Sequence, residues 1–249
     1  MKFEKKVEIL RIKKHKGRET EEFLRDVVAV AEGEAFEYIL GEVLFCGAKV
    51  DLSLRPMIPR YETEFWVRHA IEDIKKEENR PLRVLDLFSG SGNVGLAVLK
   101  NIPQSTVDFI EFDPKLNEQI EISLYINNFD RNRTKVITGD TWTGAEGLYD
   151  YIFAVPPYVP PELMEEVMSE LSAETAFSFF DKEDGYFYHK EILSKASLFL
   201  EEGGVLYLEF DITQREEIEY LAGVYGWSTY FFLQDPYEHE CVIALLKTN

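Results

Sequence analysis

The residues best suited to chemistry in this sequence lie at the ends of apolar segments. A glycine-containing loop at residues 89–92 follows the apolar run 82–88, Glu111 ends the next apolar run, and Asp140 follows a third. Glycine lets a backbone approach a ligand closely, and a carboxylate accepts hydrogen bonds from hydroxyl and amino groups. The candidate cofactor-binding residues are Asp86, Ser89, Gly90, Ser91, Gly92, Glu111, Asp140 and Trp142.

The loop itself narrows the class of cofactor. Its sequence, SGSGNVG, is neither the GxGxxG dinucleotide fingerprint nor the GxxxxGK[ST] phosphate loop. Several nucleotide-binding families share a glycine turn of this kind, so the loop alone is weak evidence. The missing phosphate motifs favour a cofactor without phosphate.

The acids that follow suggest how a nucleoside would be held. Glu111 lies about twenty residues past the loop, where Rossmann-type sites place the acid that binds the ribose hydroxyls. Asp113 competes for that role, and its alternative is a solvated turn. Asp140 is placed to accept from an adenine amino group. Trp142 either borders the adenine or packs in the core.

A rigid aromatic segment, Val155-Pro156-Pro157-Tyr158, follows the fourth apolar run, YDYIFA. The two prolines stiffen the chain, and the tyrosine ring can pack on a planar group. Such a run is otherwise a rigid surface turn, and its position after the fourth apolar run is what makes it a catalytic candidate.

The surrounding pattern predicts an α/β fold in which strands alternate with helices in a doubly wound sheet. Ligands of such sheets bind at the carboxyl ends of the strands. We expect helices over residues 1–40 with breaks at Gly33 and Gly41, then a hairpin with its turn near Gly47. A helix is predicted from about Thr63 to Lys76. Another should begin near residue 189 and end at the two glycines 203–204, before a final antiparallel pair of strands.

Charge and composition limit the partners. The chain of 249 residues has a net charge of −19, but residues 1–18 carry eight basic and two acidic side chains, which leaves −25 on the remainder. An acidic body repels a phosphate backbone, so nucleic acid is disfavoured as substrate. The basic start is a partner-docking segment, a solvated helix face or a frayed tail. No run suggests a membrane span or signal peptide, and two scattered cysteines offer no metal site.

The ordered set of loop, Glu111 and Asp140 resembles class I S-adenosylmethionine (SAM) methyltransferases. The segments GEAFEYILGEVLFCGAKVDLSLRPMIPRYETE, EDGYFYHKEIL and LEEGGVLYLEF narrow the resemblance to the HemK/PrmC protein-glutamine methyltransferases. This resemblance implies a Rossmann-like seven-stranded sheet with a reversed last hairpin and a small helical N-terminal domain. It also favours Glu111 over Asp113, because Pro114 follows as in the methyltransferase pattern. The implied division is residues 1–60, helices plus hairpin connector, and residues 61–249, the methyltransferase domain.

The family's NPPY signature stands here as VPPY. In related enzymes the asparagine oxygen and a proline carbonyl accept hydrogen bonds from the substrate amide, and the aromatic ring packs on it. The resemblance therefore assigns catalysis to Val155, Pro156, Pro157 and Tyr158, and substrate binding to Arg60, Thr63 and Glu64 of PRYETE, where Tyr61 replaces the family's proline. Valine offers no acceptor, and the loss of one costs roughly 10²–10³ in rate.

The resemblance predicts a cytoplasmic, SAM-dependent enzyme that methylates a glutamine side chain in a translation protein, namely the GGQ loop of a peptide-chain release factor, with S-adenosylhomocysteine as product. Two alternatives stay open. One is an attenuated enzyme or a binding protein with this fold, because of Val155. The other is a nucleic-acid amino-methyltransferase, because related PPY motifs serve base amino groups.

Overall fold

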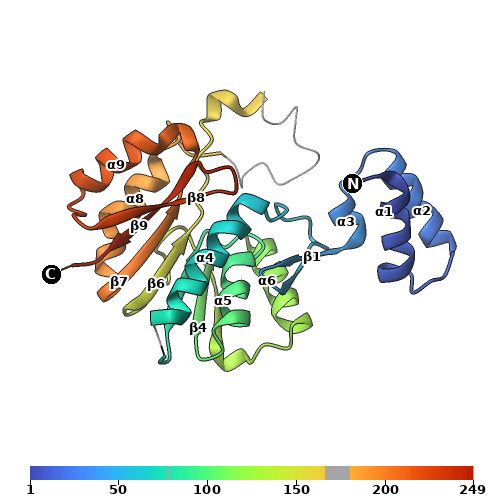
Figure 1. The fold of residues 1–249 in the computed structure, drawn as a ribbon, viewed down its shortest axis with the longest axis horizontal. Coiled ribbons are helices and arrows are strands. Elements are labelled where there is room, and N and C mark those ends of the chain that lie inside the picture. The colour runs from blue at the N-terminus through green and yellow to red at the C-terminus, as the bar shows by residue number, and fades with distance from the viewer. Residues whose placement is uncertain (78, 166–179, 249) are drawn as a thin grey trace.

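A seven-stranded sheet organises the chain, as the computed structural model shows for residues 1–77, 79–165 and 180–248 (Figure 1). Its strand order is β5-β4-β3-β6-β7-β9-β8, with β5 to β7 parallel and β9 antiparallel to both of its neighbours. The predicted α/β sheet with a reversed last hairpin is confirmed. The strands are β3 (Arg83–Leu87), β4 (Thr106–Glu111), β5 (Thr134–Thr138), β6 (Tyr149–Ala154), β7 (Leu200–Glu209), β8 (Tyr230–Gln234) and β9 (Glu240–Leu246).

Helices cover both faces of this sheet, which explains why its central strands are almost continuously apolar. Trp66 of α4 belongs to the core on one face, which α5 and α6 also cover, and Ile192 of α8 belongs to the core on the other, with α9. The helices of these two layers are α4 (Tyr61–Glu77), α5 (Asn93–Asn101), α6 (Pro114–Ile126), α8 (Phe187–Lys195) and α9 (Arg215–Val224).

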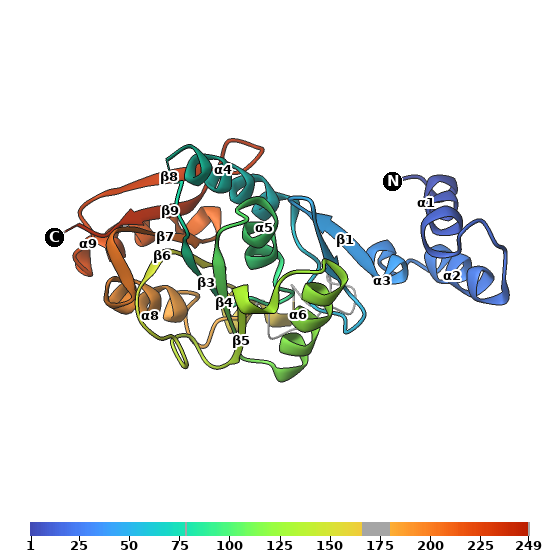
Figure 2. The ribbon, with the colours of Figure 1, turned by 90° about the horizontal axis from the view of Figure 1, so that it is seen from below.

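The first forty residues form a small helical unit with a core of its own, centred on Leu10 and Phe23. Both views place it to one side of the sheet, with the hairpin β1–β2 between them (Figures 1 and 2). Its elements and the hairpin are α1 (Phe3–Ile9), η1 (Leu10–Lys14), α2 (Glu21–Ala31), α3 (Phe36–Leu40), β1 (Glu42–Phe45) and β2 (Ala48–Asp51). The basic start is therefore helical, and a frayed tail is the wrong interpretation of it.

The hairpin is docked against α6 rather than free. Its turn falls at Cys46-Gly47, as predicted near Gly47, and both residues have positive φ. Lys49 N donates to Asn127 Oδ1 at 3.0 Å, and Asn127 Nδ2 returns a bond of 2.7 Å to Lys49 O. Because α4 bonds to the hairpin and to the sheet alike, the division at residue 60 stays a prediction.

One predicted helix end is wrong. Helix α8 stops at Lys195, a 3₁₀ turn η5 (Ala196–Leu198) follows, and Gly203 and Gly204 lie inside β7. Leu200 already pairs with Tyr149, so tertiary pairing overrides the helical pattern. The pairing of β7 with β6 shifts its register near these glycines. Gly203 has φ of +76° there, and its N–H donates to Lys247 O at 3.1 Å.

The described helices also bear on the membrane question. None of those within residues 1–77, 79–165 and 180–248 combines the length and apolar character that a bilayer crossing requires.

Candidate active site

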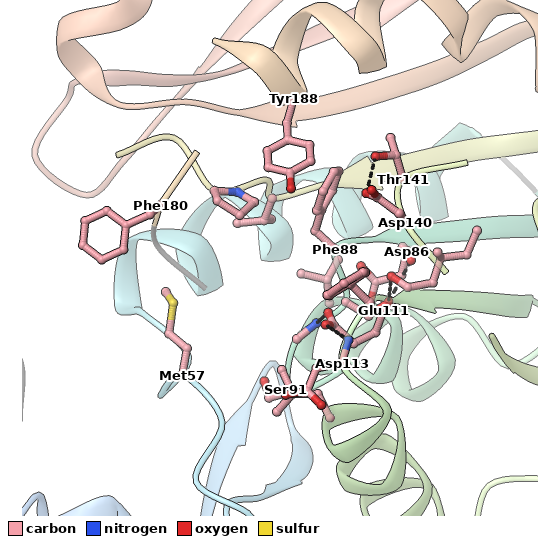
Figure 3. A pocket seen from close by; sticks show the side chains of 18 of the residues that line it. Met57, Asp86, Phe88, Ser91, Glu111, Asp113, Asp140, Thr141, Phe180 and Tyr188 are labelled. Carbon is pink, nitrogen blue, oxygen red and sulfur yellow. Dashed lines mark hydrogen bonds between the residues drawn. The ribbon is translucent and has the colours of Figure 1, made fainter. Parts of the chain in front are cut away.

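A pocket of about 470 Å³ opens where β3, β4, β5 and β6 end. Figure 3 shows that side chains from several of these segments point into it. Eleven of the residues singled out from the sequence line it: Arg60, Thr63, Asp86, Ser89, Gly90, Ser91, Glu111, Asp113, Asp140, Val155 and Pro157. The tertiary structure thus brings most of the cofactor candidates and most of the acceptor candidates into one cavity.

The glycine loop turns sharply between β3 and α5. Gly90 and Gly92 have φ of +53° and +77°. A Cβ on Gly92 would lie 3.0 Å from Ile120 Cγ1, so both conformation and close packing require glycine there. Gly92 caps α5 and does not line the pocket, whereas Gly90 and Ser91 do.

Asp86, at the end of β3, is buried and is bonded to both the glycine loop and helix α5. Its Oδ2 accepts from Gly95 N at 2.8 Å, and burial raises the pKa of Asp86 to about 7, with Glu111 adding repulsion. Ser89 Oγ donates to Asp86 O at 2.8 Å. These bonds connect the end of β3 to the first turns of α5, which fixes the floor of the pocket.

Glu111 ties the end of β4 to the glycine loop. Its Oε2 accepts from Gly90 N at 2.8 Å and its Oε1 from Asp113 N at 2.9 Å, while burial raises the pKa of Glu111 above its ordinary value. Asp113 instead caps α6, because its Oδ1 accepts from Lys115 N at 2.8 Å. This geometry supports the choice of Glu111 as the ribose acid, which stays a prediction.

Asp140 lies at the exposed rim of the pocket. Its Oδ1 accepts from Thr141 Oγ1 at 3.0 Å and its Oδ2 from Lys182 Nζ at 2.9 Å. Trp142 does not line this pocket. Its ring stacks on Phe199 at a centroid distance of 4.7 Å, so the structure favours the packing alternative for it.

The segment VPPY crosses the acceptor end of the pocket. Val155 and Pro157 line the cavity, whereas Pro156 is buried and is not part of the lining. Tyr158 lies outside the lining, and desolvation raises the pKa of Tyr158 above its usual range. Gln214 steadies the loop, since its Nε2 donates to Gly185 O at 2.9 Å and lies 3.5 Å from Tyr158 O.

The three residues of PRYETE have different surroundings. Arg60 and Thr63 line the pocket, and Thr63 Oγ1 donates to the buried Glu209 at 2.9 Å. Glu64 faces away, where its Oε1 accepts from Cys46 N at 2.9 Å and from Arg68 Nη2 at 2.7 Å. The structure therefore gives Glu64 a place at the hairpin turn, outside the pocket, because successive residues of a helix point in different directions.

Among the residues of the site that were missed in the sequence, four are notable for their exposure or their contacts. Phe112 lines the pocket with 72% of its surface exposed, an unusual state for a phenylalanine. Phe88 has φ of +57° and packs edge-on against Tyr188 at 5.0 Å. Lys182 donates a hydrogen bond to Asp140, and Glu209 accepts one from Thr63. Only Phe112 carried a local signal, because it directly follows Glu111.

Known proteins with similar sequences identify the chain. A family model described as Conserved hypothetical protein 95 matches residues 52–191. The release factor glutamine methyltransferase of Streptococcus pneumoniae is 30% identical over 200 residues, which are 79% of this chain and 69% of that protein. This chain belongs to the release factor glutamine methyltransferase family. A second member, from Thermodesulfovibrio yellowstonii, is 28% identical over 87% of this chain and 77% of its own length.

Solved structures agree on the fold. The hMettl16 catalytic domain, solved with the MAT2A 3′UTR hairpin 6, superposes with a TM-score of 0.63 at 13% identity, over 91% of this chain and 80% of that one. A methyltransferase from Pyrococcus furiosus gives a TM-score of 0.57 at 15% identity, over 92% and 97% of the two chains. The predicted enzyme class, a SAM-dependent methyltransferase, is confirmed, and the attenuated-variant alternative gains no support over it.

The pocket residues fit this cofactor. The cavity has the volume of a small-molecule site. The carboxylate of Glu111 would accept from ribose hydroxyls and that of Asp140 from an amino group, and the exposed ring of Phe112 would offer an apolar surface to a base. SAM supplies an electrophilic methyl group when it is bound.

Proposed function

We propose that this protein methylates the side-chain amide nitrogen of a glutamine in a peptide-chain release factor, with SAM as methyl donor. The observation that carries the proposal is the position of Val155 and Pro157 in the wall of the same pocket as Glu111 and Asp140. An acceptor held by the VPPY segment would share one cavity with the donor. Family membership and the names of the relatives support the choice of glutamine.

The reaction places specific demands on the acceptor end. In the transfer, the bond from sulfur to the methyl carbon breaks, a carbon–nitrogen bond forms, and the nitrogen loses a proton to solvent. Amide resonance withholds the nitrogen lone pair, so the site must orient the NH2 group. We assign this orientation to main-chain acceptors of the VPPY segment, whose Val155 and Pro157 line the cavity, since the Val155 side chain has no polar atom. Orientation of this kind accounts for much of a two-substrate rate enhancement.

Arg60 and the apolar mouth fit a peptide acceptor. Arg60, Met57 and Phe180 line the pocket. Figure 3 shows Met57 and Phe180 on the side of the pocket away from Glu111 and Asp86, where the chain flanking the target side chain would lie. The acidic body, which carries a net charge of −25 outside residues 1–18, favours a protein over a nucleic acid as partner. Because release factors act in translation, the proposal also places the protein in the cytoplasm.

The test is single-turnover methyl transfer from labelled SAM to purified release factor, beside RNA and DNA. The expected result is label on the release factor and none on a factor whose GGQ glutamine is replaced by asparagine. Label on nucleic acid alone would replace this proposal with the nucleic-acid amino-methyltransferase. Label that persists on the glutamine-free factor would show that another atom is methylated.

A further inference from the structure

Lys182 closes the rim of the pocket at the point assigned to adenine. Its Nζ lies 2.9 Å from Asp140 Oδ2, although the two residues come from the end of β5 and the segment before α8. The Asp140–Lys182 pair lies where two hollows of the surface meet. Asp140, Thr141 and Lys182 line both the main pocket and a neighbouring open hollow that contains Trp142.

Hydrogen bonds made by the neighbouring residue Asp181 fix the backbone at Lys182. Its neighbour Asp181 is only 4% exposed. The Oδ2 atom of Asp181 accepts from Gly185 N at 2.9 Å and from Glu183 N at 3.1 Å. Asp181 N donates to Val159 O at 2.8 Å, one residue past the VPPY segment. The position of Lys182 is therefore fixed relative to the acceptor loop.

The ammonium group itself has more than one partner. It lies 4.9 Å from the ring centroids of both Phe187 and Tyr188, so two aromatic faces and one carboxylate hold it. Tyr188 also lines the main pocket (Figure 3). These contacts restrict a lysine side chain that would otherwise move freely in solvent.

We propose that Lys182 is a positioning residue that orients the Asp140 carboxylate for recognition of the cofactor's adenine amino group. The proposal rests on the assignment of the adenine to Asp140. Lys182 and the Thr141 hydroxyl each occupy one oxygen, which fixes the rotation of the carboxylate. A carboxylate has about four acceptor positions, so each oxygen keeps one for an amino donor.

This arrangement selects for a donor at the purine 6-position. A 6-oxo purine, such as hypoxanthine, presents an acceptor to Asp140 and is repelled. An Asp140 that is free to rotate would discriminate less, because it could turn away from the unfavourable group. Lys182 therefore affects selectivity between the two purines more than affinity for either one.

The experiment measures binding of S-adenosylhomocysteine and of its 6-oxo analogue, S-inosylhomocysteine, by calorimetry. The selectivity ratio is the Kd of S-inosylhomocysteine divided by the Kd of S-adenosylhomocysteine. We expect Lys182→Met to reduce this ratio about three- to fivefold, the size typical of an exposed ion pair. Lys182→Arg should restore the ratio. In Asp140→Asn the ratio should fall further, and adding Lys182→Met to it should have no additional effect.

Lys190→Met is the matched control. Lys190 pairs with Asp184 at 2.9 Å and lies 5.8 Å from the Tyr186 ring, so it has the same kind of contacts outside the pocket. It should leave the ratio unchanged. A Lys182→Met variant that weakens both ligands equally, or changes neither, would overturn the proposal. Binding is measured without a methyl acceptor, so a failure of glutamine methylation leaves this result interpretable.

Discussion

Thr63 Oγ1 donates a hydrogen bond of 2.9 Å to Glu209 Oε2, although 146 residues separate them. The same oxygen accepts from Trp66 Nε1 at 2.6 Å. Glu209 ends β7, and Thr63 lies in the first turn of α4 and lines the pocket. A buried carboxylate thus attaches the helix at the acceptor end to the central sheet, and its burial raises the pKa of Glu209 to about 7.

This raised pKa makes Glu209 a source of pH-dependent stability. The folded protein holds the proton more tightly than the unfolded chain, so the stabilisation is complete below the ordinary glutamate pKa and is lost as pH rises through about 7. Glu209→Gln removes this titration. The free energy of unfolding of the variant minus that of the unchanged protein should therefore increase between pH 5 and 8.

Urea denaturation at several pH values measures this difference. Taking the difference cancels the contribution of Asp86, whose pKa is also raised to about 7. The control is Glu72→Gln, on the same helix, where the glutamate side chain is exposed to solvent and its removal should change the difference far less with pH. A flat difference for Glu209→Gln would show that this carboxyl is not protonated in the folded state.

Glu111 and Asp113 are expected to differ in their effect on cofactor affinity. Glu111→Ala removes a carboxylate that contacts the glycine loop and should weaken SAM binding roughly 10- to 100-fold, as expected for hydrogen bonds to a charged group. Asp113→Asn retains a helix-capping side chain and should change the affinity less than about threefold. Calorimetry with both variants decides between them. A larger effect at Asp113 would transfer the ribose assignment to that residue.

Val155→Asn should raise the rate of glutamine methylation by roughly 10², the value of one well-placed catalytic hydrogen bond. The gain should be in turnover, since the new acceptor would orient the amide for transfer, while SAM affinity stays nearly constant. Single-turnover transfer to release factor measures it. Val159→Asn, just past the segment and outside the pocket lining, is the matched control. Equal rates for Val155→Asn and the unchanged protein would mean that an acceptor at position 155 does not contribute to catalysis in this protein.

Gly95→Ala should destabilise the fold by about 1–3 kcal/mol, the usual cost of overpacking. A Cβ there would come 2.7 Å from Phe109 Cζ, where α5 packs on β4. Gly223→Ala is the counterpart on α9, where a Cβ would meet no atom within 4 Å, and it should stabilise by about 0.5–1 kcal/mol. Thermal or urea unfolding compares the two. Similar effects for both would show that α5 can move away from the sheet.

Local patterns predicted most of the fold. Apolar runs of five or six residues indicated β3, β4, β5 and β6, and the parallel sheet followed from their alternation with helices. The end of α8 was the exception, because the residues before Gly203 form a helical pattern locally, yet Leu200 pairs with Tyr149 in the sheet. The pairing partner is distant in sequence, and no local signal specifies it.

Segments that end in a carboxylate or a glycine turn are visible in the sequence, and the rule that parallel strands end at one edge brought Asp86, Glu111 and Asp140 together. Which of the remaining polar residues face the pocket depends on the folded arrangement. Folding turns Glu64 towards Cys46 and places Trp142 on Phe199. It also supplies Glu209 and Lys182, because hydrogen bonds and ion pairs depend on distances of about 3 Å that spacing along the chain does not set.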